Sequence, residues 1–179
     1  LDQAIASKAY VRIIDLSKTR LSELQAIYGN DNIEYIVSSE HAVTEALKDS
    51  DLVIGAVYVV GKKAPKIIKT KMLKSMKAGA VLVDISIDQG GCFESSKPTT
   101  HDNPTYVIDG VIHYCVTNMP GAVPLTATQA LNKSTLKYVE ELANKGIDKA
   151  LEDNKHLANG LNISQGEIVH PAVKEALSN

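Results

Sequence analysis

Short apolar runs alternate with amphipathic segments along most of the chain. The runs are rich in β-branched residues and predict strands at 10–16, 33–37, 52–57, 80–86 and 113–117. The segments between them predict helices at 18–28, 40–48 and 71–77. Strands that are apolar along almost their whole length and alternate with helices are typical of a doubly wound α/β fold with a parallel sheet.

Polar residues mark the expected ends of these helices. Ser17, Ser39 and Thr70 each stand just before a helical segment, where a side-chain oxygen can accept a hydrogen bond from a free backbone N–H. Gly29 suits the left-handed position that follows a helix. A cap is also the favoured reading of Ser39 over a ligand contact.

The pattern changes after Pro124. A long helix is predicted at 126–145 and a second at 147–154, followed by a short strand or hairpin around Gln165-Gly166. Pro171 suits the first position of a last helix at 172–177. We therefore divide the chain into an α/β domain at 1–123 and a helical segment at 124–179.

Composition excludes several classes of function. The net charge is −2 and the pI about 6.2, so there is no electrostatic reason to expect binding to nucleic acid or to an acidic membrane surface. No apolar run has membrane-spanning length, and no signal peptide is recognised. Lysines gather at 62–71, where a solvated face is favoured over a phosphate site.

The cysteines and histidines give no metal site and no disulfide framework. Cys92 and Cys115 lack the spacing of either, so a reduced, cytoplasmic chain is expected. Cys92 has no flanking base or cation that would favour a thiolate, and Cys115 lies in an apolar run, so packing is favoured for both. Among the histidines only His101 lies in a loop near the strand ends, and a surface role is favoured for it.

Polar residues collect where the predicted strands end. In an open α/β sheet the ligand lies across the carboxyl ends of the strands, and here these ends carry Asp15, Ser38, the loop 57–61, the segment 84–88 and Asn118. A carboxylate such as Asp15 can accept two hydrogen bonds from the ribose of NAD, although an Asp at a strand end is often only a turn residue. The same choice holds for Asp84.

Asp88 is the stronger candidate of the two carboxylates after the fourth strand. It directly precedes Gly90-Gly91, where the backbone can bend sharply or approach a ring because there is no Cβ. The G-x-G-x-x-G turn of a dinucleotide fold is not found: fourteen residues precede Asp15, and the first glycine is Gly29. We therefore expect a Rossmann-like sheet that lacks its first strand and glycine-rich loop, with residues 1–9 as the end of a helix.

Three motifs carry a family resemblance. The run DISIDQGGCFE at 84–94, PTT at 98–100 and VTNMP at 116–120 resemble the NAD-binding domain of alanine dehydrogenase. The resemblance covers most of residues 4–150 and includes 11–15, 51–56 and 61–65. The related domain of proton-translocating transhydrogenase is similar in fold but differs at DQGGCFE.

The resemblance implies a role for each matching position. Asp15 would hold the adenine ribose, Asp88 would be the catalytic aspartate, and Asn118 would stand beside the substrate. The implied cofactor-binding residues are Asp15, Arg20, Ser38, Val57, Ile67, Ile85, Ser86, Ile87, Asp88, Val116, Asn118 and Met119. Arg20 often is Lys in the family, so the charge is kept.

The implied reaction is the NAD-dependent interconversion of L-alanine with pyruvate and ammonia. In this family the partner histidine and the basic residues that hold the substrate carboxylate lie in an N-terminal substrate domain, which this sequence does not contain. The segment 124–179 would return to that domain and to the subunit contacts of a homohexamer. The 179-residue sequence by itself is therefore expected to be inactive.

Two other functions stay open at this point. The chain resembles, more weakly, the NAD(H)-binding subunit of a proton-translocating transhydrogenase. It could also be a non-catalytic module that binds NAD or other subunits. The sequence upstream of Leu1 in the gene, with or without a strand followed by G-x-G-x-x-G, would separate these readings.

Overall fold

The α/β part of the chain forms the elements that its apolar pattern predicts. The computed structural model describes residues 1–59 and 63–178. The first elements are α1 (Asp2–Ala6), β1 (Val11–Asp15), α2 (Lys18–Tyr28), β2 (Ile33–Val37), α3 (Glu40–Leu47) and β3 (Leu52–Gly55). Ser17 Oγ accepts a hydrogen bond from the Arg20 N–H at 3.1 Å, and Ser39 Oγ accepts one from the Ala42 N–H at 3.1 Å. Both predicted N-caps are confirmed.

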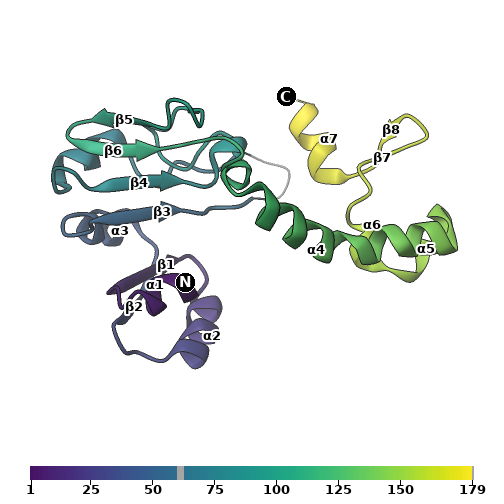
Figure 1. The fold of residues 1–179 in the computed structure, drawn as a ribbon, viewed down its shortest axis with the longest axis horizontal. Coiled ribbons are helices and arrows are strands. Elements are labelled where there is room, and N and C mark those ends of the chain that lie inside the picture. The colour runs from purple at the N-terminus through teal and green to yellow at the C-terminus, as the bar shows by residue number, and fades with distance from the viewer. Residues whose placement is uncertain (60–62, 179) are drawn as a thin grey trace.

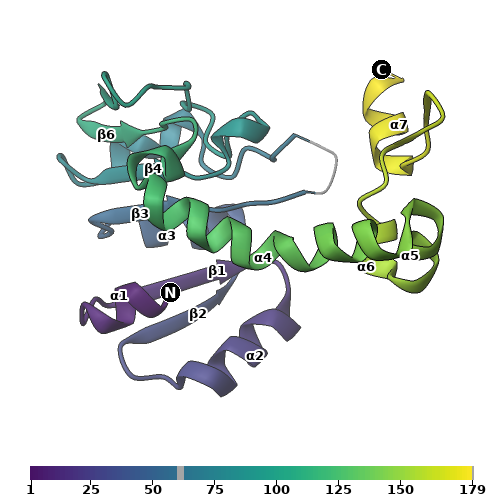
Figure 2. The same ribbon diagram turned by 45° about the vertical axis from the view of Figure 1, so that its right-hand side comes forward.

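The strands of the α/β part form two separate sheets rather than one continuous sheet. Strand β1 pairs with β2, and β3 pairs in turn with β4 (Val81–Asp84), β6 (Val111–Tyr114) and β5 (Thr105–Ile108). Of these six strands, only β5 runs antiparallel to its neighbour. Figures 1 and 2 show β1, β2 and α2 as one group next to β3.

The strand order is that of a doubly wound dinucleotide fold. That fold has the order 3-2-1-4-5-6, and β2–β1 and β3–β4–β6 take the positions 3-2 and 4-5-6. Within residues 1–59 and 63–178, no strand pairs with the second edge of β1 or of β3. The Rossmann-like α/β class is confirmed, and the sheet is divided at the position of strand 1.

In this region one strand was not predicted, and the predicted end of another is wrong. The hairpin partner β5 was not predicted, although Asp109 and Gly110 have φ of 50° and 79° and form the Asp-Gly turn that favours a tight hairpin. Strand β6 ends at Tyr114 instead of continuing to 117, because the Thr99 N–H bonds to the Cys115 carbonyl at 3.0 Å and pulls the chain out of the ladder.

The connection between β3 and β4 also differs from the prediction. It holds a 3-10 helix, η1 (Thr70–Ser75), instead of an α-helix at 71–77. Thr70 does not cap it: the Thr70 N–H donates to Glu94 Oε2 at 2.7 Å, and Lys69 is the residue at the cap position. The loop that follows β4 thus sets this turn.

The main core lies between β3, β4, β6 and α3. It contains Phe93, Leu73 and Leu82, which are fully buried. The β1–β2 pair is joined to this core by Ile14, which packs against it, and by the side chain of Arg12.

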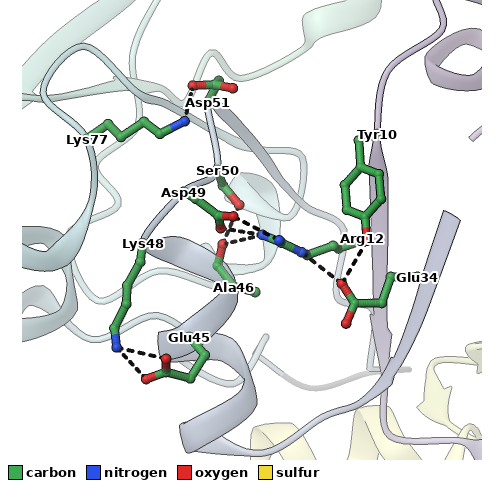
Figure 3. Close-up of polar contacts among 10 residues, drawn as sticks. All are labelled: Tyr10, Arg12, Glu34, Glu45, Ala46, Lys48, Asp49, Ser50, Asp51 and Lys77. Carbon is green, nitrogen blue, oxygen red and sulfur yellow. Dashed lines mark hydrogen bonds and ion pairs between the residues drawn. The ribbon is translucent and has the colours of Figure 1, made fainter. Parts of the chain in front are cut away.

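Arg12 links β1 to both β2 and the end of α3 (Figure 3). Its Nε donates to Glu34 Oε2 at 2.9 Å, and its Nη2 donates to Asp49 Oδ2 at 2.9 Å. Its Nη1 also reaches the Ala46 carbonyl at 3.3 Å. The hydrogen bond with Asp49 raises the pKa of Arg12 and lowers the pKa of Asp49. These residues are among those that line an open hollow of about 460 Å³.

A helical arm follows the α/β part. It consists of η3 (Met119–Ala122), α4 (Pro124–Lys145), α5 (Ile147–Asp153), α6 (Lys155–Ala158), the hairpin β7 (Ile163–Ser164)–β8 (Glu167–Ile168) and α7 (Pro171–Leu177). Figures 1 and 2 show α4 leading from the sheet to α5 and α6 at its far end. The hairpin around Gln165-Gly166 is confirmed, and the helix predicted at 147–154 ends one residue earlier.

Two further points concern the arm. Helix α4 starts at Pro124, where the predicted division of the chain falls, and none of its residues is buried. The division itself, at 123/124, stays a prediction.

Among the described helices, none combines the length and the apolar character that crossing a bilayer requires.

Candidate functional site

The loop after β4 turns back on the buried carboxylate of Asp84. Asp84 is fully buried and accepts hydrogen bonds from the backbone N–H of Ser86 at 3.0 Å and of Cys92 at 2.9 Å. The Ser96 hydroxyl and the Cys92 thiol donate to the same carboxylate. Asp84 is therefore more than the turn residue that the sequence suggested as one option.

The outer side of this loop is held by residues 64–68. The Ala64 N–H donates to the Gln89 carbonyl at 3.0 Å, and the Ile67 N–H to the Cys92 carbonyl at 2.8 Å. The Lys66 ammonium donates to the carbonyls of Gly90 and Gly91 at 2.6 and 2.9 Å. Lys66 therefore has a specific structural contact in addition to the solvated position that the lysine cluster indicated.

The two glycines of this loop have different roles. Gly90 and Gly91 both have positive φ, 89° and 75°. A Cβ on Gly91 would lie 2.7 Å from Asp84 Oδ2, whereas one on Gly90 would meet nothing within 4 Å. Gly91 is thus required by the close approach of the backbone to Asp84, and Gly90 only by its φ.

Cys92 is a packing residue. Burial, and then the charge of Asp84, raise the pKa of its thiol to about 12. A thiol with such a pKa stays protonated at neutral pH and is a poor nucleophile. Cys115 is free and fully buried as well. The burial of both cysteines agrees with the packing roles expected from the sequence.

The other two motifs of the resemblance lie next to each other. The Thr117 N–H donates to the Thr99 carbonyl at 3.2 Å, so the segments 98–100 and 116–120 run side by side. Asn118 has a φ of 56°, and its carbonyl lies 3.1 Å from Nε2 of His101. His101 is exposed, as expected, and Nε2 of its ring forms a hydrogen bond with the backbone carbonyl of Asn118, a candidate site residue.

The residues expected near the nicotinamide differ in how far their side chains are exposed to solvent. Asp88, on the short 3-10 helix η2 (Ile87–Gln89), is exposed and has no hydrogen-bond partner among the described residues. Ile85 is 54% exposed. Ser86 is buried and donates from Oγ to the Val57 carbonyl at 2.7 Å.

Several of the remaining candidates have side chains that are buried or half-buried, so little of each side chain is accessible to a ligand. Ile87 and Val116 are buried, so only their main chain is available to a ligand. Val57 and Ile67 are half-buried and pack against the core, and Met119 is half-buried on η3. Gly61, in the predicted loop 57–61, lies outside the described residues.

The residues expected at the adenosine end lie on the other pair of strands. The Ser38 N–H donates to the Asp15 carbonyl at 2.9 Å, so these two strand ends are neighbours. Asp15 Oδ1 accepts from the Ser17 N–H at 2.7 Å, while no described residue donates to Oδ2. Arg20 forms an ion pair with Glu23 at 3.0 Å and not with Asp15. One carboxylate oxygen thus remains for a ligand.

Some residues of this region could not be found from the sequence. Ser96 and Lys66 hold the loop through contacts that depend on the tertiary fold, and neither stands in a recognisable motif. Within the residues that the structure describes, no group of three or more His, Cys, Asp or Glu side chains is placed to hold a metal ion.

Known proteins similar to this chain agree with the motif resemblance. Alanine dehydrogenases from Halomonas elongata and Lysinibacillus sphaericus are 53% and 48% identical to it over 173 and 174 residues. These matches cover 97% of this chain and 46% of each relative, so the chain spans about half the length of the curated relatives it matches.

Solved structures give the same picture. An L-alanine dehydrogenase superposes with a TM-score of 0.85 and 46% identity, covering 99% of this chain and 48% of that one. A transhydrogenase from Sinorhizobium meliloti has a TM-score of 0.69 and 22% identity over 92% of this chain and 43% of that one, which is a likeness of fold. The family model described as "Alanine dehydrogenase/PNT, C-terminal domain" matches residues 1–171. The chain belongs to this family.

Proposed function

We propose that this chain is the NAD-binding part of an alanine dehydrogenase, which converts L-alanine, water and NAD⁺ to pyruvate, ammonium, NADH and a proton, and also runs the reverse reductive amination. One observation carries the proposal: the loop after β4 exposes the carboxylate of Asp88, which has no hydrogen-bond partner among the described residues. The segments 98–100 and 116–120 run side by side, and the second follows β6, the strand that pairs with β4. The high identity to the alanine dehydrogenases supports it. The cytoplasm is the proposed location.

The residues present fit a dinucleotide that lies across the strand ends. Asp15 Oδ2 has no described donor and stands beside Ser38, which suits the ribose at the adenosine end. Ile85 offers an exposed apolar side chain at the other end, where the nicotinamide would lie. When bound, NAD supplies the hydride acceptor.

Asp88 would act on the substrate nitrogen. A carboxylate next to that nitrogen stabilises the cationic amine and the iminium that forms as hydride leaves the Cα. It can also orient the water that hydrolyses the iminium to pyruvate and ammonium. Asn118, which is exposed next to His101, is proposed to stand beside the substrate.

The substitution Asp88→Asn tests the proposal in the protein as its gene encodes it. The amide keeps the size of the side chain but removes the charge, so we expect kcat to fall by about 100-fold or more. The dissociation constant for NADH, measured by fluorescence titration, should change little. A near wild-type kcat would show that Asp88 is a turn residue.

Asp102→Asn is the matched control, because it removes another exposed carboxylate from a nearby loop. It should leave kcat unchanged. The two alternative functions are tested by the same assay: a transhydrogenase subunit or a non-catalytic module would bind NADH without any turnover of pyruvate and ammonium.

A further inference from the structure

Asp84 is a buried carboxyl group that the proposed chemistry does not use. A carboxylate without access to water is stable only when its oxygens are well supplied with donors. All four groups that contact Asp84 can donate: the backbone N–H of Ser86 and Cys92, the Ser96 hydroxyl and the Cys92 thiol. Among the described residues, no Lys, Arg or His forms an ion pair with it.

These donors lie at both ends of the segment that carries Asp88. The segment begins at Ser86, whose N–H donates to Asp84 Oδ1 at 3.0 Å. It ends at Cys92, whose N–H donates to Asp84 Oδ2 at 2.9 Å. The helix η2 with Asp88 lies between them. The carboxylate of Asp84 therefore fixes both ends of the segment 86–92, and the exposed side chain of Asp88 lies near the middle of this segment.

A turn residue would make only part of this pattern. An Asp that forms a simple turn accepts from the N–H two residues later, which here is that of Ser86. The contacts with Cys92 and Ser96 cross 8 and 12 residues of sequence, and Gly91 lacks the Cβ that would collide with Asp84 Oδ2. On the outer side, Lys66 holds the carbonyls of Gly90 and Gly91.

We propose that Asp84 is a positioning residue whose carboxylate holds the segment 86–92, so that Asp88 is presented to the reacting centre. The catalytic part of this inference rests on the proposed function of Asp88. The holding of the loop rests on the geometry alone.

Asp84→Asn is the direct test. The amide is nearly the same size, but its NH₂ replaces an acceptor with a donor, so at least one of the four contacts becomes a clash of two donors. A displacement of Asp88 by about 1 Å is expected to lower kcat on the order of 10- to 100-fold. The affinity for NADH should change by less than about three-fold, because most of the cofactor contacts lie elsewhere.

A double-mutant cycle separates positioning from a general loss of stability. If Asp84 acts through Asp88, adding Asp84→Asn to Asp88→Asn should lower kcat only slightly further. If Asp84→Asn lowers kcat by the same factor in both backgrounds, the positioning role is overturned.

Two neighbouring serines provide a matched pair of controls. Ser96→Ala removes a donor to Asp84, whereas Ser95→Ala removes a buried hydroxyl that bonds to His113 Nε2 at 2.8 Å. Both should lower the melting temperature, but only Ser96→Ala should lower kcat. An equal loss of kcat in both variants would overturn the inference.

Amide hydrogen exchange tests the loop independently of activity. In Asp84→Asn the N–H groups of Ser86 and Cys92 should exchange faster, whereas Leu82 in β4 should keep its protection. Unchanged protection at Ser86 and Cys92 would overturn the holding of the loop, even in an active enzyme. If the unaltered protein fails to turn over L-alanine, the proposed function falls and the catalytic part of this inference with it, while the exchange result still decides the holding.

Discussion

We expect Asp15 to control the cofactor choice, because its Oδ2 has no donor among the described residues and would face the ribose. A 2′-phosphate at ~4 Å would be repelled by up to about 4 kcal/mol at intermediate dielectric, and less with solvent present. Asp15→Ser should therefore lower the preference for NAD over NADP by about ten-fold or more. The measurement is kcat/KM for both cofactors, with Glu23→Gln as a control on the neighbouring helix. An unchanged ratio would remove Asp15 from the ribose site.

The two glycines of the site loop should respond differently to alanine. Gly90→Ala meets open space and costs only the left-handed backbone, about 1–2 kcal/mol. Gly91→Ala adds a contact at 2.7 Å to Asp84 Oδ2 and should cost about 1–3 kcal/mol more. Urea unfolding of the two variants gives the difference directly. Equal losses would mean that the loop can move away from Asp84.

At the level of single residues, sequence patterns identify what is exposed and local. Asp88 and Asp15 follow predicted strands, and the structure leaves a carboxylate oxygen of each without a donor among the described residues. The roles of Ser96 and Lys66 depend on segments that are distant in sequence, so no local pattern contains them.

Helix α4 has several exposed apolar side chains and no buried residue. Leu136 and Val139 are 53% and 58% exposed and, three residues apart, lie on one face. We propose that this face contributes to a homo-oligomer, a hexamer by family likeness. Leu136→Glu together with Val139→Glu should dissociate it at micromolar concentration, as seen by light scattering.

The control for this prediction is Lys137→Glu, which changes charge on another face of the same helix. It should leave the assembly intact. If the unaltered protein is already a stable monomer at micromolar concentration, the exposed face of α4 has a different use.

Elements with strong local signals are predicted best. The caps at Ser17 and Ser39 and the turn at Gln165-Gly166 are formed by neighbouring residues and appear as expected. Helix η1 and the end of β6 are set by Glu94 and Thr99, which reach them from other parts of the chain. Their boundaries could not be found from the segments alone.

The whole molecule combines one large core with a smaller β1–α2–β2 unit. The unit has few buried residues and is tied to the core mainly by Ile14 and Arg12, with no ladder hydrogen bonds between β1 and β3. We expect amides of β1 and β2 to exchange hydrogen at lower free energy than those of β4 and β6. Equal protection in both sheets would show that the molecule opens as one unit.

The overall architecture follows from the apolar pattern, since alternating strands and helices leave few arrangements other than a doubly wound sheet. The division of that sheet between β1 and β3 falls where the first strand stands in the order 3-2-1-4-5-6, and the sequence predicted a sheet without that strand. The motif order places the candidate adenosine residues on one side of the division and the candidate nicotinamide residues on the other.

Within the 179-residue chain, this division has a thermodynamic consequence for the proposed cofactor. A dinucleotide that contacts Asp15 on one sheet and the segment 85–88 on the other would link the β1–α2–β2 unit to the large core. These are the two parts that we expect to unfold locally at different free energies. Binding of the dinucleotide would then require the two units to be closed against each other. The measured affinity would therefore be lower than the contacts alone would give. Conversely, NADH at 100 times its dissociation constant would stabilise the β1–β2 unit against opening by about 2.7 kcal/mol, so that the cofactor would act as part of the architecture it binds.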